Sequence, residues 1–280
     1  MSHPQLTPIR RFKPRDHQDD LDAFEICVIC VICGLLAATF LAQIEPISVV
    51  FRCLSVNKGS ALQMGRMRKA QLSFALYLVA FHAAWTVWVL LGYPRLQLLG
   101  EQTILYMLIN VVVRALVWVL PVFVYLCYVK GVAPGSYLKL RDHWRRGLLA
   151  AVVFSIFNFL FFAAQHGLPH FRAQGITWNS VFSTTLLIGF MEEIPYRGFI
   201  FQQLNEWVSF SKAAVLSSLL FVTIHLPGWI SLHLFRIHLA IFIFVFGLLM
   251  VGLLRLSKSL WAPIVAHSLN DFFSVVLFRI

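Results

Sequence analysis

Long apolar runs dominate this chain and restrict what it can fold into. Several reach the roughly 20 residues that a helix needs to cross a bilayer. In addition, 59% of the 280 residues are hydrophobic and only 12% are charged, whereas a soluble domain carries about a quarter charged residues. The runs fall at residues 24–44, 70–92, 103–129, 147–165, 179–204, 213–226, 234–255 and 261–279.

Only α-helices and closed β-barrels satisfy all their backbone hydrogen bonds in lipid. Barrel strands alternate apolar and polar residues, and these runs do not. The sequence therefore predicts an all-α, polytopic integral membrane protein with about eight transmembrane helices. We expect three parts, namely a polar N-terminal tail (1–22), N-terminal membrane helices (23–146) and a C-terminal membrane core (147–280).

The formal net charge of +11 is distributed in short clusters between the apolar runs. Clusters at 66–69, 139–146 and 255–258 are typical of cytoplasmic loops, and they give segments two to eight a consistent orientation. With no soluble domain to carry a basic face, we expect no nucleic-acid partner. The side of the N-terminal tail stays open, because the first segment can be a single crossing or a hairpin broken at Glu45-Pro46.

Ionisable groups deep inside a membrane span are costly and usually functional. The alternative is that each one is a buried structural contact. Three separate helices of the C-terminal core supply such groups, which favours one shared site over isolated contacts. The deeply placed groups are Glu192, Glu193, His225, His267 and Asp271, with His82 and Arg114 in the N-terminal helices.

The first of the three helices holds two adjacent carboxylates. Glu193 and Arg197 are four residues apart with the acid first, the better orientation for a side-chain pair, so we expect them to neutralise each other as support for the site. Glu192 is turned by about 100° from Glu193 and can face a cavity. Pro195 removes an amide and clashes with the carbonyl of Met191, which predicts a bend beside Glu192.

The other two helices repeat the spacing of four. Phe221 and His225 share one face of a helix, and His267 and Asp271 share a face of another, with Asn270 as a second neighbour of the histidine. At a rise of 1.5 Å per residue, the groups on all three helices can meet in the middle or inner half of the bilayer.

Glycine and proline residues add to this picture. Gly189 and Gly198 allow other helices to approach closely. Pro227-Gly228 is expected to end the helix that carries His225 after about 14 residues.

Taken in order, the three motifs resemble those of the CPBP family. They are EExxxR (Glu192 to Arg197), FxxxH (Phe221 to His225) and Hxxx(N/D) (His267 to Asp271). That family holds the type II CAAX prenyl endopeptidases and the bacterial bacteriocin-processing or immunity-associated intramembrane proteases. The similarity covers roughly residues 147–279, which makes 147–280 a CPBP-like catalytic membrane core.

The resemblance implies an intramembrane endopeptidase. Glu192 and His225 would activate a water that attacks a peptide carbonyl, and His267 with the residue four positions later would stabilise the oxyanion. Donors aimed at a developing oxyanion are often the largest catalytic contribution. The family implies a metal-free glutamate mechanism ahead of a zinc enzyme, in which Glu192, His225 and His267 would be the ligands. We therefore expect no cofactor.

The last motif departs from the family, which usually has asparagine where this chain has Asp271. An ionised aspartate cannot donate a hydrogen bond to an oxyanion, whereas a protonated one can. Three arrangements stay open. In the first, Asp271 is neutral and donates to the oxyanion. In the second, Asn270 donates to the oxyanion, and in the third, Asp271 only orients His267. Pro195 within the first motif is a milder departure.

Two other classes of function compete with the protease. One is a catalytically idle scaffold of the same family that tethers another membrane protein, and the other is a proton-coupled carrier. A carrier usually has two related halves with paired broken helices, and we find none in the sequence. We expect a membrane protein or peptide as substrate and a location in the bacterial inner membrane. The sequence leaves open whether the substrate is prenylated and what the oligomeric state is.

Overall fold

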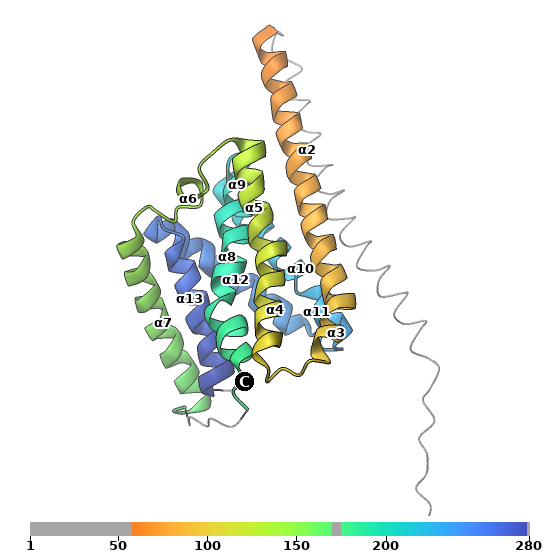
Figure 1. The fold of residues 1–280 in the computed structure, drawn as a ribbon. Helices are drawn as coiled ribbons and strands as arrows, with labels where there is room; N and C mark the ends of the chain where they lie inside the picture. The colour runs from red at the N-terminus through yellow and green to blue at the C-terminus, as the bar shows by residue number, and fades with distance from the viewer. Residues whose placement is uncertain (1–57, 170–174, 279–280) are drawn as a thin grey trace, which may run out of the picture. The chain divides into compact units, whose positions relative to one another are not determined.

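The computed structural model describes residues 58–169 and 175–278, and all regular structure in these two ranges is helical. The chain divides into two units, of which the second is Val56–Ile280. The tail at 1–22 and the apolar segment at 24–44 lie outside the described residues. The helices shown in Figure 1 therefore belong to the second unit.

Six helices of the described ranges are long and apolar enough to cross a membrane. They coincide with six of the predicted apolar segments and confirm an all-α polytopic membrane protein, although not the count of eight. The predicted segment at 179–204 is helical but is interrupted at Leu187. The six spans are Met67–Gln97, Ile104–Lys130, Trp144–His166, Phe210–Ser231, Ile237–Ser257 and Trp261–Phe278.

Three of the six spans, and the helical segment 179–204, combine α-helical pieces with wider π-helical pieces, which are labelled η. Proline explains several of these, because its ring clashes with the carbonyl four residues earlier and a widened turn relieves that clash. Thus Pro94 and Pro121 follow directly on π-helical pieces, and Pro195 lies inside one. In chain order the elements are α2 Lys58–Val87, η2 Trp88–Gly92, α3 Tyr93–Gln97, α4 Ile104–Arg114, η3 Ala115–Val119, α5 Leu120–Val124, η4 Tyr125–Lys130, α6 Pro134–Tyr137, α7 Trp144–His166, η5 Asn179–Leu186, α8 Ile188–Glu193, η6 Ile194–Ile200, α9 Phe201–Asn205, α10 Phe210–Thr223, α11 Leu226–Ser231, α12 Ile237–Ser257, α13 Trp261–Asp271 and η7 Phe272–Phe278.

The span α7 exposes large apolar side chains on one face and buries small side chains on another. In α7, Leu149, Val153 and Phe157 are exposed, whereas Ala151 and Ser155 are buried. Moving an apolar side chain from lipid into a helix–helix contact gains little free energy, so these contacts depend on close packing of small residues. This arrangement orients the small-residue face of α7 toward α13, against which it packs (Figure 1).

Glycines bring α8 close to α13 at the centre of the C-terminal core. A Cβ atom at Gly189 would lie 2.3 Å from the backbone oxygen of Ile264 and 2.5 Å from Oγ of Ser268. Gly198 likewise leaves no room for a side chain beside Leu138 and Leu260. The close approach predicted from these two glycines is therefore present, and it positions the first and third motifs next to each other.

The helix of the second motif ends differently from the expectation. We expected Pro227-Gly228 to end it, but α10 already stops at Thr223 and the chain resumes as α11 after a turn at Ile224–His225. The reason is that a proline ring clashes with the carbonyl four residues before it, here that of Thr223. Pro227 itself lies in the first turn of α11, where its missing amide costs nothing. His225 therefore lies at a helix break.

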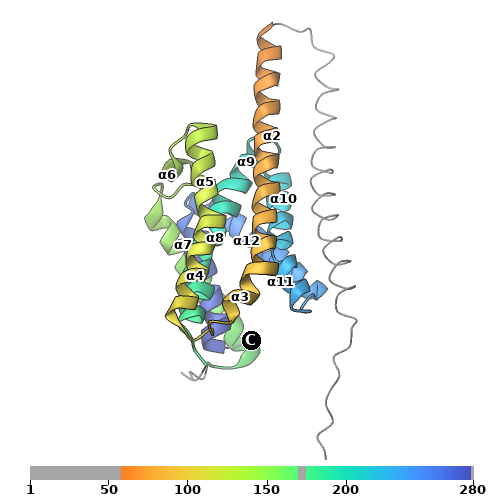
Figure 2. The same ribbon diagram turned by 45° about the vertical axis from the view of Figure 1, so that its right-hand side comes forward.

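Two of the basic clusters lie at the same end of the bundle. The backbone amide of Leu260 donates to the carbonyl of Lys139 at 3.1 Å, and the indole of Trp261 donates to the carbonyl of Leu140 at 2.8 Å. These bonds tie the loop before α7 to the turn between α12 and α13. Figures 1 and 2 show the start of α2 at the same end, so the arrangement agrees with the cytoplasmic loops predicted from charge.

A polar network closes this end of the helices. Nζ of Lys130 donates to Oε2 of Glu206 at 2.7 Å and to Oε1 of Gln203 at 2.8 Å, and the hydroxyl of Tyr137 donates to Oε1 of Glu206 at 3.0 Å. Burial, together with the charge of Glu206, raises the pKa of the Tyr137 phenol. The phenol therefore stays a hydrogen-bond donor in this network across the physiological range.

Candidate active site

Glu193 is fully buried at the end of α8 and accepts two hydrogen bonds on one oxygen. Its Oε1 atom lies 3.1 Å from Nη1 of Arg197 and 2.7 Å from Nδ1 of His267. A carboxylate paired with arginine can only accept, so Nδ1 of the imidazole carries the proton. The pair expected from the spacing of four is present, and the same carboxylate also fixes the histidine of α13.

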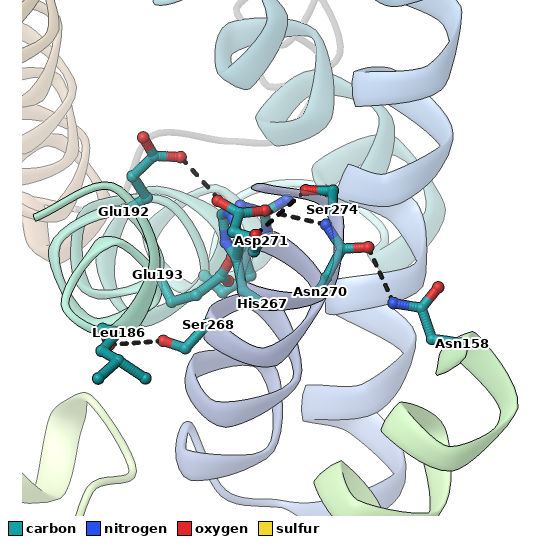
Figure 3. Close-up of polar contacts among 10 residues, drawn as sticks. Asn158, Leu186, Glu192, Glu193, His267, Ser268, Asn270, Asp271 and Ser274 are labelled. Carbon is teal, nitrogen blue, oxygen red and sulfur yellow. Dashed lines mark hydrogen bonds and ion pairs between the residues drawn. The ribbon is translucent and has the colours of Figure 1, made fainter. Parts of the chain in front are cut away.

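The other nitrogen of His267 faces two further carboxylates. Its Nε2 atom is 3.8 Å from Oε2 of Glu192 and 3.6 Å from Oδ2 of Asp271 (Figure 3). Both distances are longer than a hydrogen bond, so within the described ranges Nε2 has no hydrogen-bond partner. Glu192 and His267 are only 7% and 5% exposed. The structure thus brings the first and third motifs together around one buried imidazole.

A chain of amide hydrogen bonds holds Asp271 from the side away from His267. Nδ2 of Asn158, on α7, donates to Oδ1 of Asn270 at 2.9 Å. This bond orients the Asn270 amide so that its own Nδ2 donates to Oδ1 of Asp271 at 2.9 Å (Figure 3). Asn270 therefore points toward α7 and Asp271, and Asp271 is the member of the pair that faces His267.

His225 reaches the same region from the end of α10. Its Nδ1 atom donates to the backbone carbonyl of Phe221 at 2.8 Å, so its Nε2 carries a free lone pair in the neutral ring. The ring of Phe221 contacts both imidazoles, with centroids 4.9 Å from His225 and 6.1 Å from His267. The guanidinium of Arg197 lies 4.2 Å from the centre of the same ring. Phe221 of the second motif thus contacts residues of all three motifs.

His82 has a bridging position outside this site. Its Nδ1 donates to the carbonyl of Leu78 at 2.9 Å, and its Nε2 lies 3.3 Å from the hydroxyl of Thr223. The indole of Trp85 donates to the carbonyl of Ile224 at 3.1 Å. These contacts tie α2 to the end of α10, so His82 matches the structural alternative raised from the sequence.

Sequence reasoning missed Asn158, and it assigned Glu193 to Arg197 alone. Asn158 is a single amide in an otherwise apolar stretch of α7, and a polar side chain in a span is a usable signal when its partner is known. Its partner could not be known before α7 and α13 were placed side by side.

A metal site would need three ligands directed at one point. The residues proposed for zinc are Glu192, His225 and His267, but the described residues hold no group of three or more His, Cys, Asp or Glu side chains arranged to bind a metal ion. Nδ1 of His267 and Nδ1 of His225 are already occupied by Glu193 and a backbone carbonyl. Each of these two histidines could therefore bind a metal only through Nε2, beside the carboxylate of Glu192.

Comparison with known proteins gives one match. Residues 173–273 match the family model described as "Type II CAAX prenyl endopeptidase Rce1-like". No curated protein and no solved structure matches the chain. The matched range contains all three motifs together with the segment from η5 to α13. Residues 173–273 are therefore similar to the Rce1-like type II CAAX prenyl endopeptidase family, which confirms the resemblance to the CPBP family and supports, at family level, an intramembrane protease of the CAAX type.

Proposed function

We propose that this protein is an intramembrane endopeptidase that hydrolyses a peptide bond of a membrane-associated protein or peptide with a water activated by Glu192 and His225. One observation carries the proposal. Glu193 fixes His267 through Nδ1, so that the Nε2 side of the ring faces Glu192 within the membrane core. A proton acceptor and an oriented donor then lie next to each other, as hydrolysis of an amide requires.

Glu192 accepts the proton of the attacking water in this mechanism, and His225 orients that water. The attacking water gives one proton to the Glu192 carboxylate as its oxygen bonds to the peptide carbonyl carbon. Nε2 of His225 accepts the water's second hydrogen bond, because Nδ1 of that ring is bonded to the carbonyl of Phe221. When the C–N bond breaks, the proton on Glu192 passes to the leaving amine. No net proton is consumed at the carboxylate.

His267 stabilises the oxyanion in this mechanism. Because Nδ1 donates to Glu193, an Nε2 that also donates requires the doubly protonated ring, which the neighbouring carboxylates stabilise. Asp271 then acts as a charged acceptor that orients this ring, and Asn270 supports Asp271. The Asn270 amide supports this assignment, because one of its N–H groups already donates to Oδ1 of Asp271.

The proposed mechanism uses no metal ion. Treatment of the purified protein with a strong zinc chelator, followed by analysis of bound metal, should leave activity unchanged. Loss of activity that added zinc restores would replace this mechanism with the zinc alternative.

The test compares the membrane proteome of cells with and without the protein to find a cleaved fragment. The corresponding peptide is then incubated with purified full-length protein in liposomes. Glu192→Gln should abolish cleavage and leave thermal unfolding unchanged. Glu101→Gln, which changes an exposed carboxylate in the same way, is the matched control and should be fully active.

Either competing function would give a different result. A scaffold would leave every membrane protein intact while still binding a partner that can be co-purified. A carrier would move protons across sealed liposomes, and Glu192→Gln would stop that transport. Either outcome, with no cleavage by the unmodified protein, would overturn the proposal.

A further inference from the structure

Arg114 is a charged residue in the middle of a span that the proposed mechanism does not use. It is the last residue of α4 and lies 10 residues into the span Ile104–Lys130, about 15 Å from its start at 1.5 Å per residue. An arginine at this depth is costly unless it is paired or faces a polar interior. Its position therefore calls for an anionic partner.

The described residues provide no such partner in contact with Arg114. It forms no ion pair within 4.0 Å and no hydrogen bond with them, and its Nε atom is buried without a partner. The ring of Trp85 lies next to it, with its centroid 5.7 Å from the guanidinium carbon. A cation–π contact of this kind positions a guanidinium but leaves its N–H donors available.

The neighbours of Arg114 place it beside the catalytic groups. Trp85 donates to the carbonyl of Ile224, the residue before His225. The segment η3, which continues directly from Arg114, packs against α8 and η6 on either side of Glu193. Arg114 thus lies near the helix break at His225, through Trp85, and the segment that follows it packs against the helix that carries Glu192.

One turn before Arg114, the side-chain amide of Asn110 has a hydrogen-bond partner for its nitrogen but none for its oxygen among the described residues. Asn110 is 2% exposed, and its Nδ2 donates to Oδ1 of Asn179 at 3.0 Å. Its own Oδ1 is buried without a partner among the described residues. Asn110 and Arg114 therefore form a polar strip on the face of α4 that is directed toward η5.

We propose that Arg114 binds a carboxylate of the substrate next to the scissile bond. This inference rests on the proposed endopeptidase function and gives it a substrate class, namely peptides with an anionic group close to the cleavage site. The planar guanidinium can bond a carboxylate through two parallel N–H groups. The carboxylate can be the C-terminus of a chain that ends close to the cleaved bond, or the side chain of an aspartate or glutamate.

The test uses the substrate peptide identified above in three synthetic forms. One ends in a free carboxylate, one ends in a carboxamide, and one has its acidic side chains replaced by the matching amides. The unmodified protein in liposomes should cleave one amide form roughly 10- to 100-fold more slowly, the range expected for loss of a charge-assisted hydrogen bond. The form that loses activity identifies the source of the carboxylate.

Arg114→Gln should remove this discrimination, so that the carboxylate and amide forms are cleaved at the same slow rate. Arg114→Lys, which keeps the charge but not the paired N–H groups, should restore part of it. Arg146→Gln, at an exposed position, is the matched control and should discriminate like the unmodified protein.

The outcomes separate this inference from the proposed function. Equal cleavage of all three forms by the unmodified protein would overturn the role of Arg114 and leave the endopeptidase intact. Arg114→Gln that slows all forms equally would show that the arginine only balances the charge of Glu192. Because the comparison of peptides needs no variant, it remains decisive if Arg114→Gln does not fold.

Discussion

Gly189→Ala tests whether the distance between α8 and α13 controls the site. The new Cβ atom would lie 2.3 Å from the carbonyl oxygen of Ile264 and 2.5 Å from Oγ of Ser268, whereas ordinary contact begins at 3.4 Å. The serine hydroxyl can rotate away, but the carbonyl belongs to the backbone of α13. The two helices must therefore separate by about 1 Å.

This separation should affect both activity and stability. His267 lies between Ile264 and Ser268 on α13, so it moves away from Glu193 and Glu192 together with the helix. A displacement of about 1 Å can cost about 100-fold in rate, and overpacking costs about 1–3 kcal/mol. Thermal unfolding in detergent and cleavage of the reporter peptide in liposomes measure the two effects.

Gly252→Ala is the matched control for this experiment. Gly252 lies inside α12, and a Cβ atom there would meet nothing within 4 Å. The change should stabilise the helix by up to about 1 kcal/mol and leave activity intact. If Gly189→Ala behaves like Gly252→Ala, the close approach of α8 and α13 does not set the geometry of the site.

The other predictions concern the charged groups of the site. Arg197→Ala leaves Glu193 buried without its guanidinium partner, so the free energy of unfolding should fall by roughly 3–5 kcal/mol. Folded yield and thermal unfolding measure this loss. A stable but inactive variant would instead make Arg197 a substrate contact. Asp271→Asn should lower activity at every pH, because the amide cannot replace a charged acceptor beside His267; activity retained and extended to higher pH would show that Asp271 is a protonated donor. Asn270→Ala should cost less than the roughly 2.7–4 kcal/mol of a lost oxyanion donor, and a loss of that size in a pH profile would make Asn270 the donor.

The sequence predicts those contacts that local helix geometry determines. Glu193 and Arg197 are four residues apart on one helical segment, so their pairing requires nothing beyond the rise and turn of that helix. The bond between Glu193 and His267 joins residues 74 positions apart. It depends on the close approach of two helices at Gly189, and a spacing rule carries no information about that approach.

The break before His225 shows a second limit. Proline acts on the carbonyl four residues earlier, so the helix ends upstream of Pro227 and not at it. The sequence contains this information, but we expected the helix to end at Pro227, whereas the proline ends it four residues earlier, at Thr223. For Asn158 the limit is different, because a single amide has no preferred partner until a neighbouring helix supplies one.

A single oxygen of Glu193 receives both Arg197 of the first motif and His267 of the third. Neither donor can be exchanged in evolution without changing what the other binds. Without Arg197, the buried carboxylate of Glu193 would have His267 as its one remaining donor on this oxygen. Without His267, the carboxylate would no longer orient a group of the site. We therefore expect homologues to keep or lose these three residues together, so that substitutions at 193, 197 and 267 covary in an alignment even where the surrounding helices have diverged.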